Sequence, residues 1–340
     1  MTDAPYQHKP QKDRPRVSHP RSTRSFAPAL TRTRQRLDSS LPVEQQIDQV
    51  LHRREPHTVL QLVLGAIGFF VAMLIGGIIA GAIHAAFIGP GSELPEGVFL
   101  WSQVLASLLT IPLFFTVVVP LSRRIPVELW GPGSLRELGL GLALGAGMMA
   151  VIVGIIWLAG GYHPTGVGMT DSMWFGVAAG IGGGFGEEIL FRGFILRIVE
   201  RWVGSWPALL ISSALFGAVH LSNENATAFG AAAIGVEAGV LFAALYLWTR
   251  RLWVPIGLHI AWNFTQGAVF SSPISGLEQQ DGFIRATFSG PELLTGGAMG
   301  VEGSVVAIVV CLAVAAVALW RAHQAGRIMN RPTNFGRARA

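Results

Sequence analysis

The sequence is poor in charged residues and has almost no cysteine or lysine. Only 13% of its 340 residues are charged, whereas 51% are hydrophobic and the mean hydropathy is +0.49. Soluble domains usually carry about a quarter charged residues, so this composition excludes an ordinary water-soluble enzyme. The single cysteine, Cys311, excludes a disulfide framework, a zinc ribbon and a redox pair. The only lysines, Lys9 and Lys12, exclude a phosphate-loop lysine or a Schiff base within the membrane.

Both ends of the sequence differ from its middle. Residues 1–56 contain 11 of the 25 lysine and arginine residues and no sustained apolar period. Such a segment buries too little apolar surface to offset its ordering entropy, so we predict a disordered basic cytoplasmic tail over 1–56. This tail is either simply solvated or contacts anionic lipid or a partner. Residues 323–340 are predicted to form a second basic cytoplasmic tail.

Residues 57–322 consist of long apolar runs, each near the roughly 20 residues that a spanning helix needs. They predict an all-α, polytopic membrane bundle of about eight transmembrane helices. The expected spans lie near 58–82, 98–120, 138–160, 172–199, 206–222, 228–248, 253–270 and 303–321.

Basic residues follow the parity of the connections between these spans. Arginines occur in the second, fourth and sixth connections and in both tails, whereas the other connections contain Arg285 alone. The positive-inside rule therefore predicts that both termini are cytoplasmic. Membrane topology then explains the pI of about 10.1, and we expect the lipid bilayer rather than nucleic acid as the partner. The arginine-rich, lysine-poor usage favours a bacterial plasma membrane.

Polar groups inside the membrane are concentrated in the fourth to seventh spans. A charged group within the bilayer costs several kcal/mol by most estimates, so each is a functional candidate. A lone Glu–Arg pair or a single buried His usually serves packing, but a whole set on adjacent helices favours function. Glu237 either bonds a neighbouring helix or joins the site. The set comprises Glu187, Glu188, Arg192, His220, Glu237, His259 and Asn263.

Helical spacing sorts these residues into roles. Glu188 and Arg192 are four residues apart and share a helix face, which favours an ion pair. Glu187 is rotated by about 100° from Glu188, so it is predicted to be the free base. His259 and Asn263 are again four apart and place two polar groups on one face.

The depth of the fourth and fifth spans is also consistent with a shared site. Glu187 and His220 lie 17 and 16 residues from Gly204, the expected hairpin between their helices. Both are therefore about 25 Å along antiparallel neighbours and at one level. Phe216, one turn before His220, is expected to pack against the imidazole.

The sequence lacks the motifs of several intramembrane proteases. It has no His-Glu-x-x-His, no Gly-x-Ser-x-Gly and no Asp in any span. The remaining groups suit water activation by a Glu and a His, with a second His and an Asn stabilising an oxyanion. Alternatively, His220, His259 and Glu187 hold a zinc ion with an open position.

Three motifs resemble those of the CPBP family, which comprises CAAX prenyl endopeptidases and bacteriocin-processing proteins and is also called the Abi family. Glu187-Glu188-Ile-Leu-Phe-Arg192 is similar to EExxxR, Phe216-Gly-Ala-Val-His220 to FxxxH, and His259-Ile-Ala-Trp-Asn263 to HxxxN. The resemblance covers about residues 170–270.

The resemblance implies an eight-helix intramembrane protease with its site inside the bundle. Glu187 would activate water together with His220, His259 and Asn263 would stabilise the oxyanion, and Glu188 and Arg192 would position the others. We therefore expect an intramembrane endopeptidase that cleaves a membrane-associated peptide or protein. The alternatives are a non-enzymatic immunity or regulatory membrane protein and a proton-coupled transporter.

Overall fold

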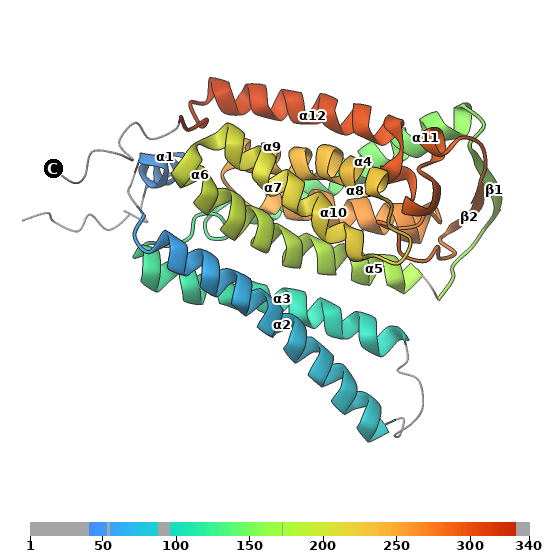
Figure 1. Cartoon of the computed structure of the whole chain (residues 1–340), viewed down its shortest axis with the longest axis horizontal. Coiled ribbons are helices and arrows are strands. Elements are labelled where there is room, and N and C mark those ends of the chain that lie inside the picture. Colours follow the sequence, from blue (N-terminus) through green and yellow to red (C-terminus); the bar gives the residue numbers. More distant parts are fainter. Residues whose placement is uncertain (1–40, 53–54, 88–95, 172, 331–340) are drawn as a thin grey trace, which may run out of the picture. The chain divides into compact units, whose positions relative to one another are not determined.

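The computed structural model describes residues 41–52, 55–87, 96–171 and 173–330 (Figure 1). Residues 1–40 and 331–340, which hold most of the two expected tails, lie outside the described residues.

Six helices are long and apolar enough to cross a membrane, so the chain is a multi-pass membrane protein. The prediction of a polytopic helical bundle is confirmed. These helices are α2 (Thr58–Phe87), α3 (Glu96–Ser122), α4 (Ser134–Leu158), α7 (Ser205–Val219) with η3 (His220–Ser222), α8 (Ala228–Ile234) with η4 (Gly235–Gly239) and α9 (Val240–Thr249), and α12 (Val305–Gln324).

The two other expected spans are also helical, but one is more polar and one is shorter. The first carries Glu187, Glu188 and Arg192, and the second has 11 residues in α10 and 6 in η5. The total of eight spans and the orientation of the termini therefore stay predictions. The first comprises α5 (Met173–Gly182), η1 (Gly183–Glu187), η2 (Ile189–Leu196) and α6 (Arg197–Val203), and the second comprises α10 (Trp253–Asn263) and η5 (Phe264–Val269).

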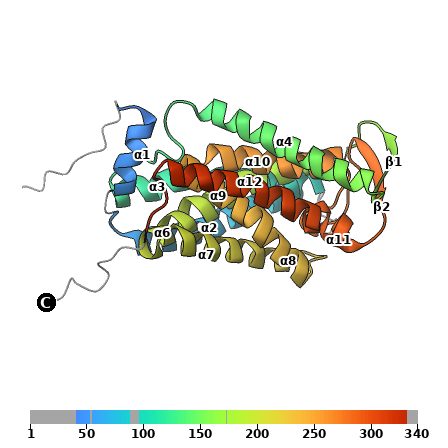
Figure 2. The same ribbon diagram turned by 90° about the horizontal axis from the view of Figure 1, so that it is seen from above.

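Close backbone approach brings the helices that carry the motifs together. A Cβ atom at Gly141 of α4 would lie 2.3 Å from the Val254 carbonyl oxygen of α10, so only glycine permits this crossing. Segments η1, η2, η4 and η5 are π-helical, a widened geometry that often occurs at functional sites. In Figure 1, α2 and α3 lie side by side below the remaining helices, and α12 lies above them. Figure 2 gives the view from above, with α12 along α9.

A short sheet, absent from the all-α prediction, connects two loops at one end of the helices. Strands β1 (Tyr162–Val167) and β2 (Ile284–Phe288) are antiparallel, and Tyr162 pairs with Phe288. The Tyr162 ring packs edge-on against Phe288 and Phe270, which fixes the sheet on η5. The chain then passes through α11 (Glu292–Thr295), η6 (Gly297–Met299) and η7 (Val301–Gly303) before α12.

Helix α1 (Val43–His52) lies within the segment that we expected to be disordered. Its apolar residues recur at helical spacing, and Ile47 and Val50 are buried in a cluster with Val127. The expectation of a disordered tail over 1–56 therefore fails for residues 43–52. The basic composition of the whole segment concealed this short amphipathic pattern.

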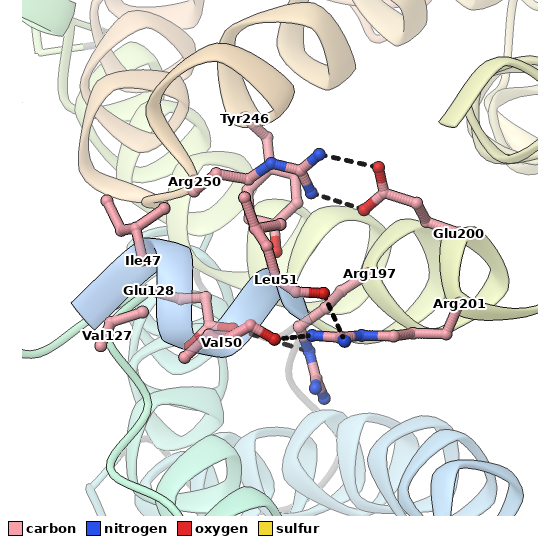
Figure 3. A pocket seen from close by; sticks show the side chains of 10 residues that line it. All are labelled: Ile47, Val50, Leu51, Val127, Glu128, Arg197, Glu200, Arg201, Tyr246 and Arg250. Carbon is pink, nitrogen blue, oxygen red and sulfur yellow. Dashed lines mark hydrogen bonds and ion pairs between the residues drawn. The ribbon is translucent and has the colours of Figure 1, made fainter. Parts of the chain in front are cut away.

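Buried ion pairs surround α1 at the end of the helices opposite the sheet (Figure 1), and we call them the ion-pair frame. Arg250 donates to both oxygens of Glu200 at 2.5 and 2.8 Å, and Arg201 donates to the Val50 carbonyl at 2.9 Å (Figure 3). Arg124 is bidentate to Glu128 at 2.5 and 2.8 Å. The frame comprises Glu55, Arg124, Glu128, Arg197, Glu200, Arg201 and Arg250.

Glu55 connects the frame to three arginines. It lies 2.6 Å from Arg197 and 3.3 Å from Arg124. Burial alone would raise the pKa of Glu55, but the charges of Arg197, Arg124 and Arg201 outweigh it and hold that pKa well below its ordinary value. The carboxylate is therefore ionised and lies among three arginines.

Candidate active site

A cavity of about 520 Å³ lies between α2, α3, α5, η1 and the ends of α7 and α10. Four of the six predicted site residues line it, namely Glu187, His220, His259 and Asn263. Glu188 and Arg192 do not line it and are completely buried. The six predicted residues thus divide into four that line the cavity and two, Glu188 and Arg192, that lie buried behind it.

Glu188 and Arg192 form a hydrogen-bonded network with His259. Arg192 Nη1 donates to Glu188 Oε1 at 2.9 Å, and His259 Nδ1 donates to the same oxygen at 3.0 Å. Arg192 Nη2 donates to the Gly239 carbonyl at 3.0 Å, which ties the network to η4. Because a carboxylate accepts from Nδ1–H, the Nε2 atom of His259 is left for another partner.

Aromatic rings enclose this network. The Arg192 guanidinium carbon lies 4.4 Å from the Phe216 ring centre and 5.0 Å from that of Phe242. Phe242 stacks on His259 with centroids 4.7 Å apart, and Phe216 packs against His220 at 4.9 Å and against His259 at 6.2 Å. The expectation that Phe216 packs against His220 is confirmed. The rings shield the network and fix both imidazoles.

Glu187 and His220 face each other at the cavity. His220 Nε2 lies 3.9 Å from Glu187 Oε2, a separation too long for a direct hydrogen bond and suited to one bridging water. His220 Nδ1 donates to the Phe216 carbonyl at 2.7 Å, so Nε2 of the neutral ring carries the lone pair. Oε2 of Glu187 has no hydrogen-bond partner among the described residues, and its side chain is 31% exposed.

His259 and Asn263 border the cavity at Gly183 of η1. A Cβ atom at residue 183 would lie 2.8 Å from His259 Nε2 and 3.1 Å from Asn263 Nδ2. Glycine therefore leaves room beside both nitrogens. Asn263 Nδ2 donates one hydrogen to the Ala179 carbonyl at 3.2 Å, and its second hydrogen is available.

The geometry does not favour the zinc alternative. Among the residues that the structure describes, no three His, Cys, Asp or Glu side chains come close enough together to hold a metal ion. His220, His259 and Glu187 thus do not form a ligand set, although each lines the cavity. The residues present fit acid–base chemistry better than metal binding.

Two other buried carboxyl groups lie away from the cavity lining. The Cys311 thiol donates to Glu237 Oε2 at 3.0 Å, so Glu237 bonds a neighbouring helix and does not line the cavity. Glu302 accepts a hydrogen bond from Trp262 Nε1 at 3.4 Å. Burial raises the pKa of Glu302, and hydrogen bonds from Ser275 oppose that rise. Sequence reasoning missed Glu302 because it precedes the last span.

Sequence reasoning also missed Gln103 and Ser107 of α3, which line the cavity. Neither side chain is ionisable, and α3 has no ionisable residue after Glu96 that would mark it as part of a site. The sequence signal that could have revealed them is their four-residue separation, which places two polar side chains on one face of an apolar span.

Comparison with known proteins gives a match over the segment that carries the motifs. Residues 169–265 match the family model of type II CAAX prenyl endopeptidase Rce1-like proteins. The family resemblance is confirmed. All three motifs lie inside this Rce1-like segment.

A curated relative extends the similarity beyond the Rce1-like segment. The "Putative membrane peptidase YdiL" of Bacillus subtilis (strain 168) is 26% identical over 226 residues, which cover 62% of this chain and 90% of the relative. No solved structure matches the chain. Together the family match and this relative support a CAAX-protease-like membrane peptidase.

Proposed function

We propose that the chain is an intramembrane endopeptidase that hydrolyses a peptide bond of a membrane-associated peptide or protein with water activated by Glu187 and His220. The observation that carries this proposal is the 3.9 Å separation of Glu187 Oε2 and His220 Nε2 at a cavity within the helical bundle. The match to Rce1-like peptidases supports it. The plasma membrane is the proposed location.

Glu187 acts as the general base. A water between Glu187 Oε2 and His220 Nε2 gives one proton to the carboxylate while its oxygen attacks the peptide carbonyl carbon. His220 orients this water by accepting its other hydrogen. When the C–N bond breaks, the proton passes from Glu187 to the leaving nitrogen. The products are a carboxylic acid and an amine, and the Glu187 carboxylate is restored.

His259 and Asn263 stabilise the oxyanion that forms during this attack. Asn263 donates its free amide hydrogen, and His259, protonated on both nitrogens, donates from Nε2. Glu188 accepts the hydrogen bond from Nδ1 of that imidazolium at 3.0 Å, which holds the ring in position. Arg192 holds Glu188 in place for this task.

Purified protein in liposomes tests the proposal with a pooled library of quenched-fluorescence decapeptides rich in Leu, Val and Ala. The wild type should cleave a subset of this library, and Glu187→Gln and His220→Ala should not. Glu44→Gln is the matched control, because the Glu44 side chain is 74% exposed and its one ion pair among the described residues is with Arg327. Failure of the wild type to cleave any member, or cleavage by Glu187→Gln at the wild-type rate, contradicts the proposal.

A further inference from the structure

Helix α3 contributes a polar edge to the cavity that lies outside the Rce1-like segment. Gln103 is partly buried, Ser107 is 4% exposed, and both line the cavity. The two residues are four apart and share a helix face. The cavity thus has a second polar side besides the one that carries Glu187 and His220.

The Gln103 amide makes no hydrogen bond with any residue that the structure describes. An amide in an apolar membrane helix is costly unless it bonds something. Its carbonyl oxygen and two N–H hydrogens are free to bond a molecule in the cavity.

Ser107 lies directly beside the proposed catalytic segment. A Cβ atom at Gly186 would lie 2.9 Å from Ser107 Oγ, and Gly186 immediately precedes Glu187. Gln103 is one helical turn away, about 6 Å along α3. The polar edge therefore begins next to the proposed general base and extends along one side of the cavity.

The spacing of this edge matches an extended peptide. Two residues of a β-strand rise about 6.6 Å, close to the 6 Å that separate Gln103 from Ser107 along the helix axis. An amide side chain pairs with a peptide group through both its donor and its acceptor. The cavity wall on α2 is apolar and consists of Phe69, Phe70 and Met73.

We propose that Gln103 and Ser107 form a backbone-binding edge that holds the substrate as an extended strand, with its apolar side chains against Phe69, Phe70 and Met73. This inference rests on the proposed endopeptidase function. A membrane helix has no free backbone groups to offer such an edge, so the substrate class is an unwound apolar segment. The polar edge recognises the extended backbone, and the apolar wall on α2 recognises apolar side chains. Neither contact requires one particular sequence.

Binding of the library decapeptide that the wild type cleaves fastest tests this edge. Affinity is measured in the Glu187→Gln background, so that the peptide stays intact. Adding Gln103→Met should raise Kd about three- to tenfold, the effect of one lost hydrogen bond. Thr116→Val is the matched control on the same helix, because Thr116 is exposed and its side chain bonds, within the described part of the chain, only the Leu113 carbonyl of its own helix. It should leave Kd unchanged.

An ester scan of the same decapeptide locates the contact. Each backbone N–H is replaced in turn by an ester oxygen, and the Glu187→Gln protein should lose affinity at one or two positions. Gln103→Met should abolish the sensitivity at one position, and Ser107→Ala, a small change that preserves the fold, at a position two residues away. An unchanged Kd for Gln103→Met, or an ester profile that neither variant alters, overturns the inference. If the wild type cleaves and Glu187→Gln does not, the proposed function stands even when Gln103 and Ser107 prove not to bind the substrate backbone.

Discussion

Two groups of carboxylates in this protein differ in the partners that surround them. In the ion-pair frame, Glu55, Glu128 and Glu200 each contact at least one arginine within 2.8 Å. At the cavity, Glu188 has an arginine and a histidine, whereas Glu187 has no arginine within ion-pair distance among the described residues and lies 3.9 Å from His220. Guanidinium groups fix the position of a carboxylate, whereas a carboxylate that lines a cavity can contact a molecule bound there. Arginine partners and deeper burial together distinguish the carboxylates of the frame from Glu187.

Glu187→Gln should give the largest effect on activity and almost none on stability. Loss of a general base lowers the cleavage rate by about 10²–10⁴-fold. The substitution removes no hydrogen bond from Oε2, so the midpoint of thermal unfolding in detergent should match the wild type. A large fall in that midpoint would show that Glu187 stabilises the fold as the frame carboxylates do, and would contradict the distinction between the two groups.

Glu55→Ala should show the opposite pattern. Removing one partner from a buried ion pair leaves uncompensated charge, and we expect a loss of about 3–5 kcal/mol in the free energy of unfolding. The cleavage rate per folded molecule should stay at the wild-type level. Glu44→Ala, an exposed pair, should cost less than about 1 kcal/mol. Equal stability of the two variants in chemical unfolding in micelles would contradict the role of the frame.

Arg192→Lys should fall between these two cases. An ammonium group lacks the planar fork that reaches both Glu188 and the Gly239 carbonyl, so one charge-assisted hydrogen bond is lost. We expect about a tenfold lower cleavage rate and a loss of about 1.5–3 kcal/mol in stability. The cleavage rate and the free energy of unfolding are measured on the same preparation. A change in the rate alone would give Arg192 a role only in activity, and a change in stability alone would give it a role only in the fold.

The pH dependence of stability should give the smallest effect. Because the pKa of Glu55 is lower in the folded protein than in the unfolded chain, its ion pairs stabilise the fold fully above the ordinary value of 4.5. This contribution is lost as the pH falls below that value, by at most about 1.4 kcal/mol per pH unit. The wild type should therefore lose stability between pH 4.5 and 3 faster than Glu55→Gln. Parallel curves would show that Glu55 does not contribute.

Local helical spacing predicted the contacts that lie within one helix. The Glu188–Arg192 pair and the packing of Phe216 on His220 follow from four-residue separations, and both are present. The bond from His259 to Glu188 was not predicted, since it joins residues 71 positions apart. Such a contact depends on which helices are neighbours, and spacing along one helix carries no information about that.

The frame and the sheet were missed for the same reason. Glu55 receives its arginines from segments far away in the sequence, and strands β1 and β2 are separated by more than four helices. Composition led us to treat residues 1–56 as one solvated segment, because their many basic residues outweighed the short apolar period of α1. The sequence left two roles open for Glu237, a bond to a neighbouring helix or a place in the site. The hydrogen bond from Cys311 of α12 supports the first.

The Phe216 ring constrains how this site can change during evolution. It contacts His220 and His259 and lies over the Arg192 guanidinium. A smaller residue at position 216 would open a void against all three groups at once, so substitutions there must be accompanied by compensating changes at several motif positions. The phenylalanine of the FxxxH motif thus packs against residues of all three motifs, so a substitution in any one of them alters the surroundings of the same ring.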